Sequence, residues 1–175
     1  MNLRTIVIFP AFENIAMINQ IREKYDPLAK LIRPHITIVF PFEDEMSNEK
    51  LLDILNERLA GVKPFKIELQ GFSKCEDEFG NYLFLNVIKG SDEIIKIHNL
   101  LYDNEFHKFD AGLAYLPHMT VGKFKNNFEL EQAYEEIKDI DYLFASNVNK
   151  IYVEMIGDNE ESKIVIEKQL KIAPH

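Results

Sequence analysis

Two spacings of apolar residues recur along this chain, one typical of helices and one typical of strands. Residues 48–61, NEKLLDILNERLAG, have the helical spacing, with apolar side chains three or four positions apart. The apolar stripe consists of Leu51, Leu52, Leu55 and Leu59. Ser47 can cap the start of this helix, and Gly61 suits its end. Residues 3–9, which are rich in β-branched side chains, instead predict a first strand.

The same patterns predict elements along the whole chain. They are a strand at 3–9, a helix at 14–24, a strand at 34–42, a helix at 48–61, strands at 65–75 and 81–89, a helix that begins at Ser91, a strand at 118–124, a helix at 129–140, and strands at 146–156 and 163–172. Each half of this order reads β-α-β-α-β and then continues with further strand.

We therefore expect an α+β fold made of a duplicated, bilobal unit. Two antiparallel sheets would line a central groove, with the helices outside. No Gly/Ser-rich or low-complexity linker interrupts the chain, which favours a single domain over residues 1–175. Its lobes are expected at roughly 1–76 and 81–175, and strands can exchange between them.

Composition and charge narrow the range of partners. Apolar residues make up 46% of the chain and charged residues 28%, as in ordinary globular proteins. With 29 acidic and 20 basic residues the net charge is −9, so the protein's own field opposes binding along a nucleic-acid duplex. A phosphate ligand should therefore bind in a local pocket, as a small nucleotide or the end of an RNA.

The remaining composition points to the cytoplasm. No apolar run is long enough to span a membrane, and the short run TIVIFPAF makes a poor signal peptide. Cys75 is the single cysteine, so no disulfide forms within the chain, and acidic residues follow it. We expect a cytoplasmic protein that works as a monomer.

Two segments about half a chain apart repeat one polar pattern. RPHITIVF at 33–40 and LPHMTVGKF at 116–124 both contain Pro-His-x-Thr followed by apolar residues. Because residues two apart in a strand share a face, His35 and Thr37 point the same way, as do His118 and Thr120. If a pseudo-twofold axis relates the halves, the two pairs face each other across the groove.

Two facing histidines suit acid–base chemistry at phosphorus. With ordinary pKa values near 6.5, one imidazole can be neutral and the other protonated near pH 7. The neutral one takes a proton from a nucleophile, and the charged one gives a proton to the leaving oxygen. Threonine hydroxyls can hydrogen-bond the phosphate oxygens between them.

The paired His-x-Thr motifs of this chain resemble those of the 2H phosphoesterase superfamily, whose best-known branch is the 2'-5' RNA ligase-like, or LigT-like, proteins. The resemblance implies that His35 and His118 are catalytic and that Thr37 and Thr120 bind phosphate. It implies a metal-independent, cofactor-free phosphoesterase acting on a 2',3'-cyclic or 2'-5' linked nucleotide. Lys123, Arg33 and Tyr115 are candidates for substrate binding because they lie next to the motifs.

Other interpretations remain open from the sequence. Each of the two motif histidines could instead be a buried residue bonded to a backbone carbonyl. His98 lies in a helical apolar stripe, so we expect it in the core or at its boundary. His107 could edge the pocket, and His175 ends the chain. The protein could also be a catalytically silent nucleotide or RNA-end binder that uses the same pocket, or an interaction domain with an acidic surface. Turnover separates the enzyme from the binder.

Overall fold

The elements of the computed structural model, which describes residues 1–172, largely follow the expected order. The strands are β1 (Asn2–Ile8), β2 (Ile36–Asp44), β3 (Phe65–Asp77), β4 (Gly80–Lys89), β5 (His118–Phe124), β6 (Phe144–Val148), β7 (Lys150–Ile156) and β8 (Ser162–Gln169). The helices are α1 (Ile15–Tyr25), α2 (Asn48–Arg58), α3 (Ser91–Tyr102) and α4 (Asn127–Ile137), with a 3-10 turn η1 at His107–Phe109. The predicted α+β class is confirmed.

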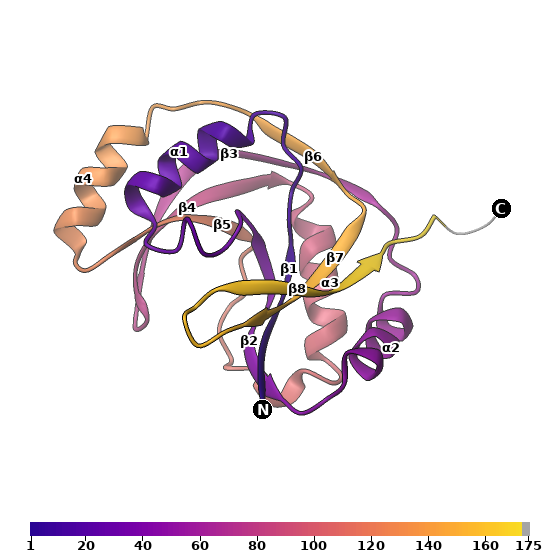
Figure 1. The fold of residues 1–175 in the computed structure, drawn as a ribbon. Coiled ribbons are helices and arrows are strands. Elements are labelled where there is room, and N and C mark those ends of the chain that lie inside the picture. The colour runs from indigo at the N-terminus through magenta and orange to yellow at the C-terminus, as the bar shows by residue number, and fades with distance from the viewer. Residues whose placement is uncertain (173–175) are drawn as a thin grey trace.

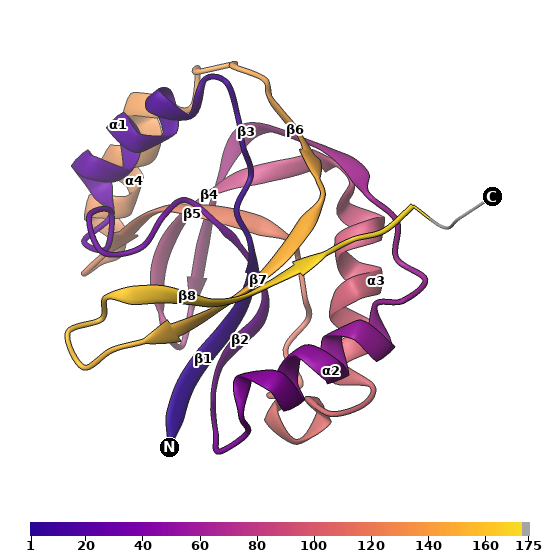
Figure 2. The same ribbon diagram turned by 45° about the vertical axis from the view of Figure 1, so that its right-hand side comes forward.

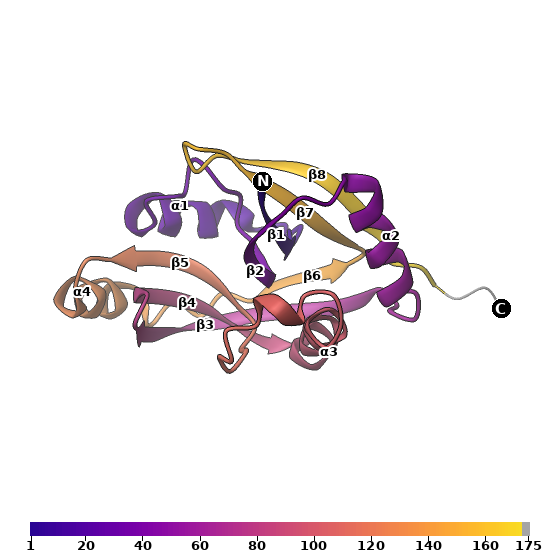
Figure 3. The ribbon, with the colours of Figure 1, turned by 90° about the horizontal axis from the view of Figure 1, so that it is seen from below.

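The strands form one antiparallel sheet, where two had been expected (Figure 1). Their order is β6-β3-β4-β5-β2-β1-β7-β8. The two central strands, β5 and β2, pair through a single residue pair, Ile36 with Met119. That pair joins what would otherwise be two sheets of four strands. The sheet curls, so that β1, β2, β7 and β8 form one layer and β3, β4, β5 and β6 the other (Figure 3).

The strand expected at 146–156 is in fact two strands at different places in the sheet. β6 pairs with β3 at one end of the sheet, and β7 pairs with β1 and β8 near the other. The chain passes between them at Asn149, whose carbonyl accepts hydrogen bonds from the Leu170 amide and the Gln169 side chain. At this one residue the chain leaves β6, and its carbonyl bonds to the last residue of β8 and to the residue that follows.

The helices gather in two pairs at opposite ends of the molecule, α1 with α4 and α2 with α3 (Figure 2). α1 packs on β5, α3 on β2, α2 on β8, and α4 on β3 and β4. Ser47 caps α2 as expected, accepting a hydrogen bond from the Lys50 amide. Ile36 and Ile38 of β2 and Met119 and Val121 of β5 are buried in the core, which leaves the polar motif residues on the opposite face. No helix within residues 1–172 is long and apolar enough to cross a membrane.

Candidate active site

The two central strands, together with the residue directly before β2, carry the four motif side chains on one face of the sheet. Each of the four is half-buried. They are His35, Thr37, His118 and Thr120. The pairing of Ile36 with Met119 sets His35 opposite Thr120 and Thr37 opposite His118. In a regular antiparallel pair, opposite side chains lie about 5 Å apart and diagonal ones about 7–8 Å. The histidines are diagonal neighbours, a spacing at which both can reach one phosphate.

The same kind of hydrogen bond holds each of the two histidine rings. Nδ1 of His35 lies 2.7 Å from the Arg33 carbonyl oxygen, and Nδ1 of His118 lies 2.7 Å from the Leu116 carbonyl oxygen. Since a carbonyl only accepts, Nδ1 donates in both rings. The neutral imidazoles therefore keep Nε2 unprotonated, as a general base requires. A protonated imidazole would present an N–H donor at the same atom, as a general acid requires.

Burial lowers the pKa of both histidines. Desolvation is the largest cause for His35, and the positive charges of Arg22 and His118 lower its pKa further. Desolvation also lowers the pKa of His118. Each charged imidazole therefore disfavours a charge on the other, so the pair tends to carry one proton rather than two. An anionic phosphate bound between the rings would offset these effects and favour the charged form.

Aromatic residues from neighbouring strands support the two rings. Phe84 of β4 stacks on His118, with 3.6 Å between ring centroids and 19° between planes. Phe9, just beyond β1, meets His35 edge-on at 6.4 Å and 76°. The sequence gave no reason to select Phe84. Phe84 lies between Leu83 and Leu85, so its neighbours in the sequence do not indicate that it borders the site.

A β-bulge turns Lys123 onto the face that carries the motif residues. Thr120 pairs with Phe84 and Lys123 pairs with Tyr82, because the register between β4 and β5 shifts between Leu83 and Phe84. Tyr82 and Phe84 share a face, so their partners do as well. Without the extra residue in β5, Lys123, which is three positions after Thr120, would point to the opposite face of the sheet. The Lys123 ammonium is exposed and lies 5.7 Å from the centre of the Tyr82 ring.

The structure gives Arg33 and Tyr115 different surroundings. Arg33 is exposed, and its guanidinium lies 4.4 Å from the centre of the Phe9 ring, at the His35 end of the site. The Tyr115 hydroxyl donates a 2.7 Å hydrogen bond to the Thr37 carbonyl, and its ring stacks on His98 at 3.7 Å. Arg33 is thus free to meet a ligand, whereas Tyr115 holds the backbone of β2.

The other histidines lie outside this cluster. Nδ1 of His98 is 2.7 Å from the Ile38 carbonyl oxygen, on the helix-covered side of β2, as expected for a residue in a helical stripe. His107 is exposed in η1. His175 lies outside the described residues.

One buried acid on the motif face was not found from the sequence. Glu154 of β7 pairs with Thr5 of β1, and its neighbour on the same face, Tyr152, pairs with Val7. Val7 in turn pairs with Thr37, so Glu154 lies on the face of the motif residues. Its side chain is only 3% exposed, and Oε2 has no hydrogen-bond partner among residues 1–172. The sequence signal was an acid at an alternating position of an apolar strand.

Glu154 should make the stability of the protein depend on pH. Burial raises its pKa from 4.5 to about 7, so the folded protein binds a proton that the unfolded chain releases between these values. Stability is therefore lost as the pH rises through this window. Glu154→Gln should raise the free energy of unfolding by about 2–3 kcal/mol more at about pH 8.5 than at about pH 5. Urea unfolding at the two pH values measures this, and an equal effect at both would contradict it.

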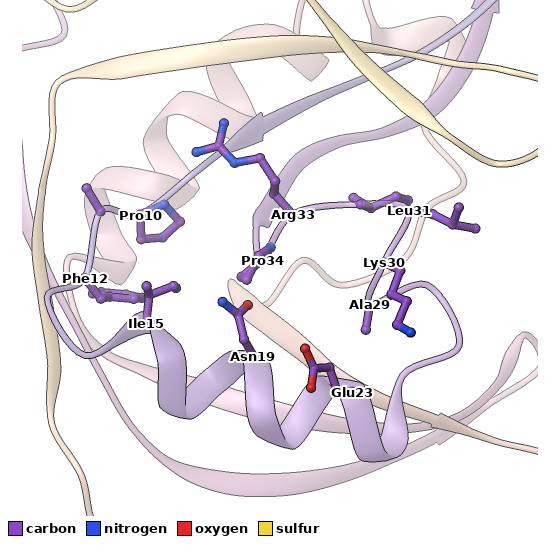
Figure 4. Close-up of a pocket in the computed structure, with 12 residues that line it drawn as sticks. Pro10, Phe12, Ile15, Asn19, Glu23, Ala29, Lys30, Leu31, Arg33 and Pro34 are labelled. Atoms are coloured by element: carbon purple, nitrogen blue, oxygen red, sulfur yellow. The ribbon is translucent and has the colours of Figure 1, made fainter.

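A cavity of about 640 Å³ adjoins the His35 end of the site, between α1 and residues 29–34 (Figure 4). Asn19 and Glu23 of α1 face it from one side, and Arg33 and Pro34 line the other. None of the four motif residues lines it, but Pro34 directly precedes His35. The cavity can therefore extend the motif face in that direction.

Sequence comparison identifies relatives along most of the chain. Residues 9–158 match the family described as the 2'-5' RNA ligase superfamily. A Geobacillus kaustophilus (strain HTA426) protein named "Putative phosphoesterase GK0864" is 30% identical over 152 residues, which cover 85% of this chain and 84% of the relative. A protein of Geobacillus thermodenitrificans (strain NG80-2) named "Putative phosphoesterase" is 28% identical over 152 residues, with the same coverage.

Structural comparison finds the same fold. The crystal structure of the Thermus thermophilus protein TT0787 has a TM-score of 0.64 at 14% identity and covers 98% of this chain and 100% of its own. The crystal structure of Escherichia coli LigT complexed with 3'-AMP also has a TM-score of 0.64 at 14% identity, with coverage of 98% and 99%. The resemblance drawn from the two motifs is confirmed: this chain belongs to the 2'-5' RNA ligase superfamily of 2H phosphoesterases.

Proposed function

We propose that this protein is a metal-independent phosphoesterase that hydrolyses a 2',3'-cyclic or 2'-5' linked nucleotide phosphodiester. The observation that carries the proposal is the antiparallel pairing of Ile36 with Met119, which sets both His-x-Thr motifs side by side on one face. His35 and His118 act as general base and general acid. Thr37 and Thr120 bind the phosphate.

The reaction needs only these four side chains and water. Nε2 of the neutral histidine takes a proton from the attacking water as its oxygen bonds to phosphorus. The bond from phosphorus to the ribose oxygen breaks, and Nε2 of the protonated histidine supplies a proton to that oxygen. The threonine hydroxyls donate hydrogen bonds to the non-bridging oxygens, whose charge grows in the transition state. Ligation is the same path in reverse, with the two histidines exchanging roles.

Charge and size favour a small substrate. A net charge of −9 weakens binding to a long duplex, while Arg33 and Lys123 supply positive charge at opposite edges of the motif face. LigT, a protein of the same fold, was crystallised with 3'-AMP, ATP and NADP+. Hydrolysis of a 2',3'-cyclic adenylate yields 2'-AMP or 3'-AMP, depending on which ribose oxygen leaves. We propose a nucleotide or RNA-end substrate, handled by a single bilobal domain of residues 1–175 that works as a cytoplasmic monomer.

Turnover of a substrate panel tests this proposal. The panel comprises 2',3'-cyclic nucleotides with each of the four bases and 2'-5' linked dinucleotides, with 3'-5' linked dinucleotides for comparison and EDTA throughout. We expect hydrolysis of at least one cyclic or 2'-5' linked compound at a rate that EDTA does not change. Hydrolysis that EDTA abolishes would contradict the metal-independent mechanism.

A catalytically silent binder is the alternative function, since half-buried histidines and threonines can hold a phosphate without transferring it. Such a protein would bind members of the panel and leave them intact. Titration calorimetry with the same compounds therefore accompanies the turnover assay. Binding without turnover of any member would replace the phosphoesterase proposal with this one.

A further inference from the structure

Beyond the four motif residues, a continuous set of side chains leads from His35 across β1 to β7. The ring of Phe9, which meets His35 edge-on, also lies 5.0 Å from the ring of Tyr152. Glu154 is the next residue along the same face of β7. Two aromatic rings and one carboxyl group therefore lie side by side, starting at a proposed catalytic histidine.

The carboxyl group of Glu154 is in an unusual state for a buried acid. Asp44, another buried acid of the described residues, forms an ion pair with Arg4, although its Oδ2 has no hydrogen-bond partner. Glu154 is also buried, but within residues 1–172 it has no ion pair, and its Oε2 has no hydrogen-bond partner. Buried polar groups are nearly always satisfied, and an unsatisfied one calls for an explanation. Burial without a partner also raises the pKa of this acid, which makes the folded protein less stable.

The distance from the motif threonines to Glu154 matches a nucleoside. Two strand spacings, from β2 over β1 to β7, amount to about 10 Å, and one step along the face adds about 7 Å. The Cα atoms of Thr37 and Glu154 are thus roughly 12 Å apart. A phosphate held by the threonines would leave its ribose and base to extend across β1 to Tyr152 and Glu154, with Phe9 on the other side of the Tyr152 ring.

We propose that Phe9, Tyr152 and Glu154 form a nucleobase subsite that selects guanine. This inference rests on the proposed nucleotide substrate and names its base. An ionised carboxylate only accepts hydrogen bonds, and guanine presents two adjacent donors, N1–H and the 2-amino group, to its two oxygens. The tyrosine and phenylalanine rings supply the apolar surface on which the base packs.

Arg33 is the movable part of this subsite. Its side chain is exposed and lies over Phe9, and its charge is the one that acts on Glu154. When a base packs on these rings, the exposed guanidinium can turn aside from Phe9, while its charge still favours the ionised acid. A purine between Arg33 and the Phe9–Tyr152 pair would replace the contact that Arg33 makes in this structure.

Binding of two nucleoside 3'-monophosphates tests the subsite without requiring turnover. 3'-GMP and 3'-IMP differ only in the 2-amino group of the base. The wild type should bind 3'-GMP about 10-fold more tightly or better, since the lost hydrogen bond is to a charged acceptor. In Glu154→Gln this ratio should fall close to one. Glu167→Gln is the matched control, because Glu167 pairs with Tyr152 in register but is exposed and bound to Lys150.

The outcomes separate this inference from the proposed function. Equal binding of the two nucleotides by the wild type, no binding of either, or a preference that survives in Glu154→Gln would each overturn the subsite. In those cases turnover of the substrate panel would still support the phosphoesterase. Conversely, a Glu154-dependent preference without any turnover would support the subsite in a protein that only binds nucleotides.

Discussion

Replacing either His35 or His118 with alanine is expected to lower kcat for the best substrate by roughly 10²–10⁴-fold, the usual contribution of general acid–base catalysis. Each residue supplies one of the two proton transfers, and no other histidine of the described residues lies on the motif face. The double variant should lose little more than either single one, because the two groups act as a unit. Steady-state kinetics on purified variants measures these losses.

His107→Ala is the matched control for the histidine variants. His107 is exposed in η1, and its loss should leave kcat within about twofold, as for most surface substitutions. Thermal unfolding of all variants shows whether the fold survives. If a correctly folded His35→Ala or His118→Ala protein kept more than a tenth of the wild-type kcat, that histidine would not be a catalytic acid or base.

The second large effect is expected from the threonines. Thr37→Val and Thr120→Val keep the shape and strand preference of the side chain but remove the hydroxyl donor. Each should lower kcat by about 10²-fold, the loss seen when one donor to a developing oxyanion is removed. The losses should be similar, because each threonine faces the histidine of the other motif across the β2–β5 pair.

Thr37→Ser and Thr120→Ser separate the hydroxyl from the rest of the side chain. Serine keeps the donor, so these variants should retain most of the activity that the valine variants lose. Equal losses in the serine and valine variants would mean that the methyl group, and hence packing, is what matters at these positions. The phosphate-binding role would then be wrong.

The position of the four central residues followed from the sequence because it depends on local rules. A strand repeats every two residues, so His35 and Thr37 had to share a face, and so did His118 and Thr120. How the two pairs lie relative to each other did not follow in this way. The repeated order of elements predicted pairs that face each other across a groove between two sheets, whereas the pairing of Ile36 with Met119 sets them side by side in one sheet.

Features that depend on distant contacts could not be predicted in this way. The single sheet follows from one residue pair between strands far apart in sequence, and the split at Asn149 coincides with bonds to the C-terminal end of β8 and the residue after it. Lys123 reaches the motif face only through a bulge in β5, which changes the alternation that a sequence pattern assumes. Glu154 looks like an ordinary strand residue until its burial and its neighbours are known.

The pH dependence of kcat/KM, measured with EDTA on the best substrate of the panel, tests the two-histidine mechanism most directly. It reports the ionisation of the free enzyme, in which one histidine must be neutral and the other protonated. We expect a bell-shaped profile whose maximum lies below pH 6.5, the ordinary histidine value, because burial lowers the pKa of both His35 and His118. A profile that stays flat between about pH 5 and about pH 8 would contradict acid–base catalysis by this pair.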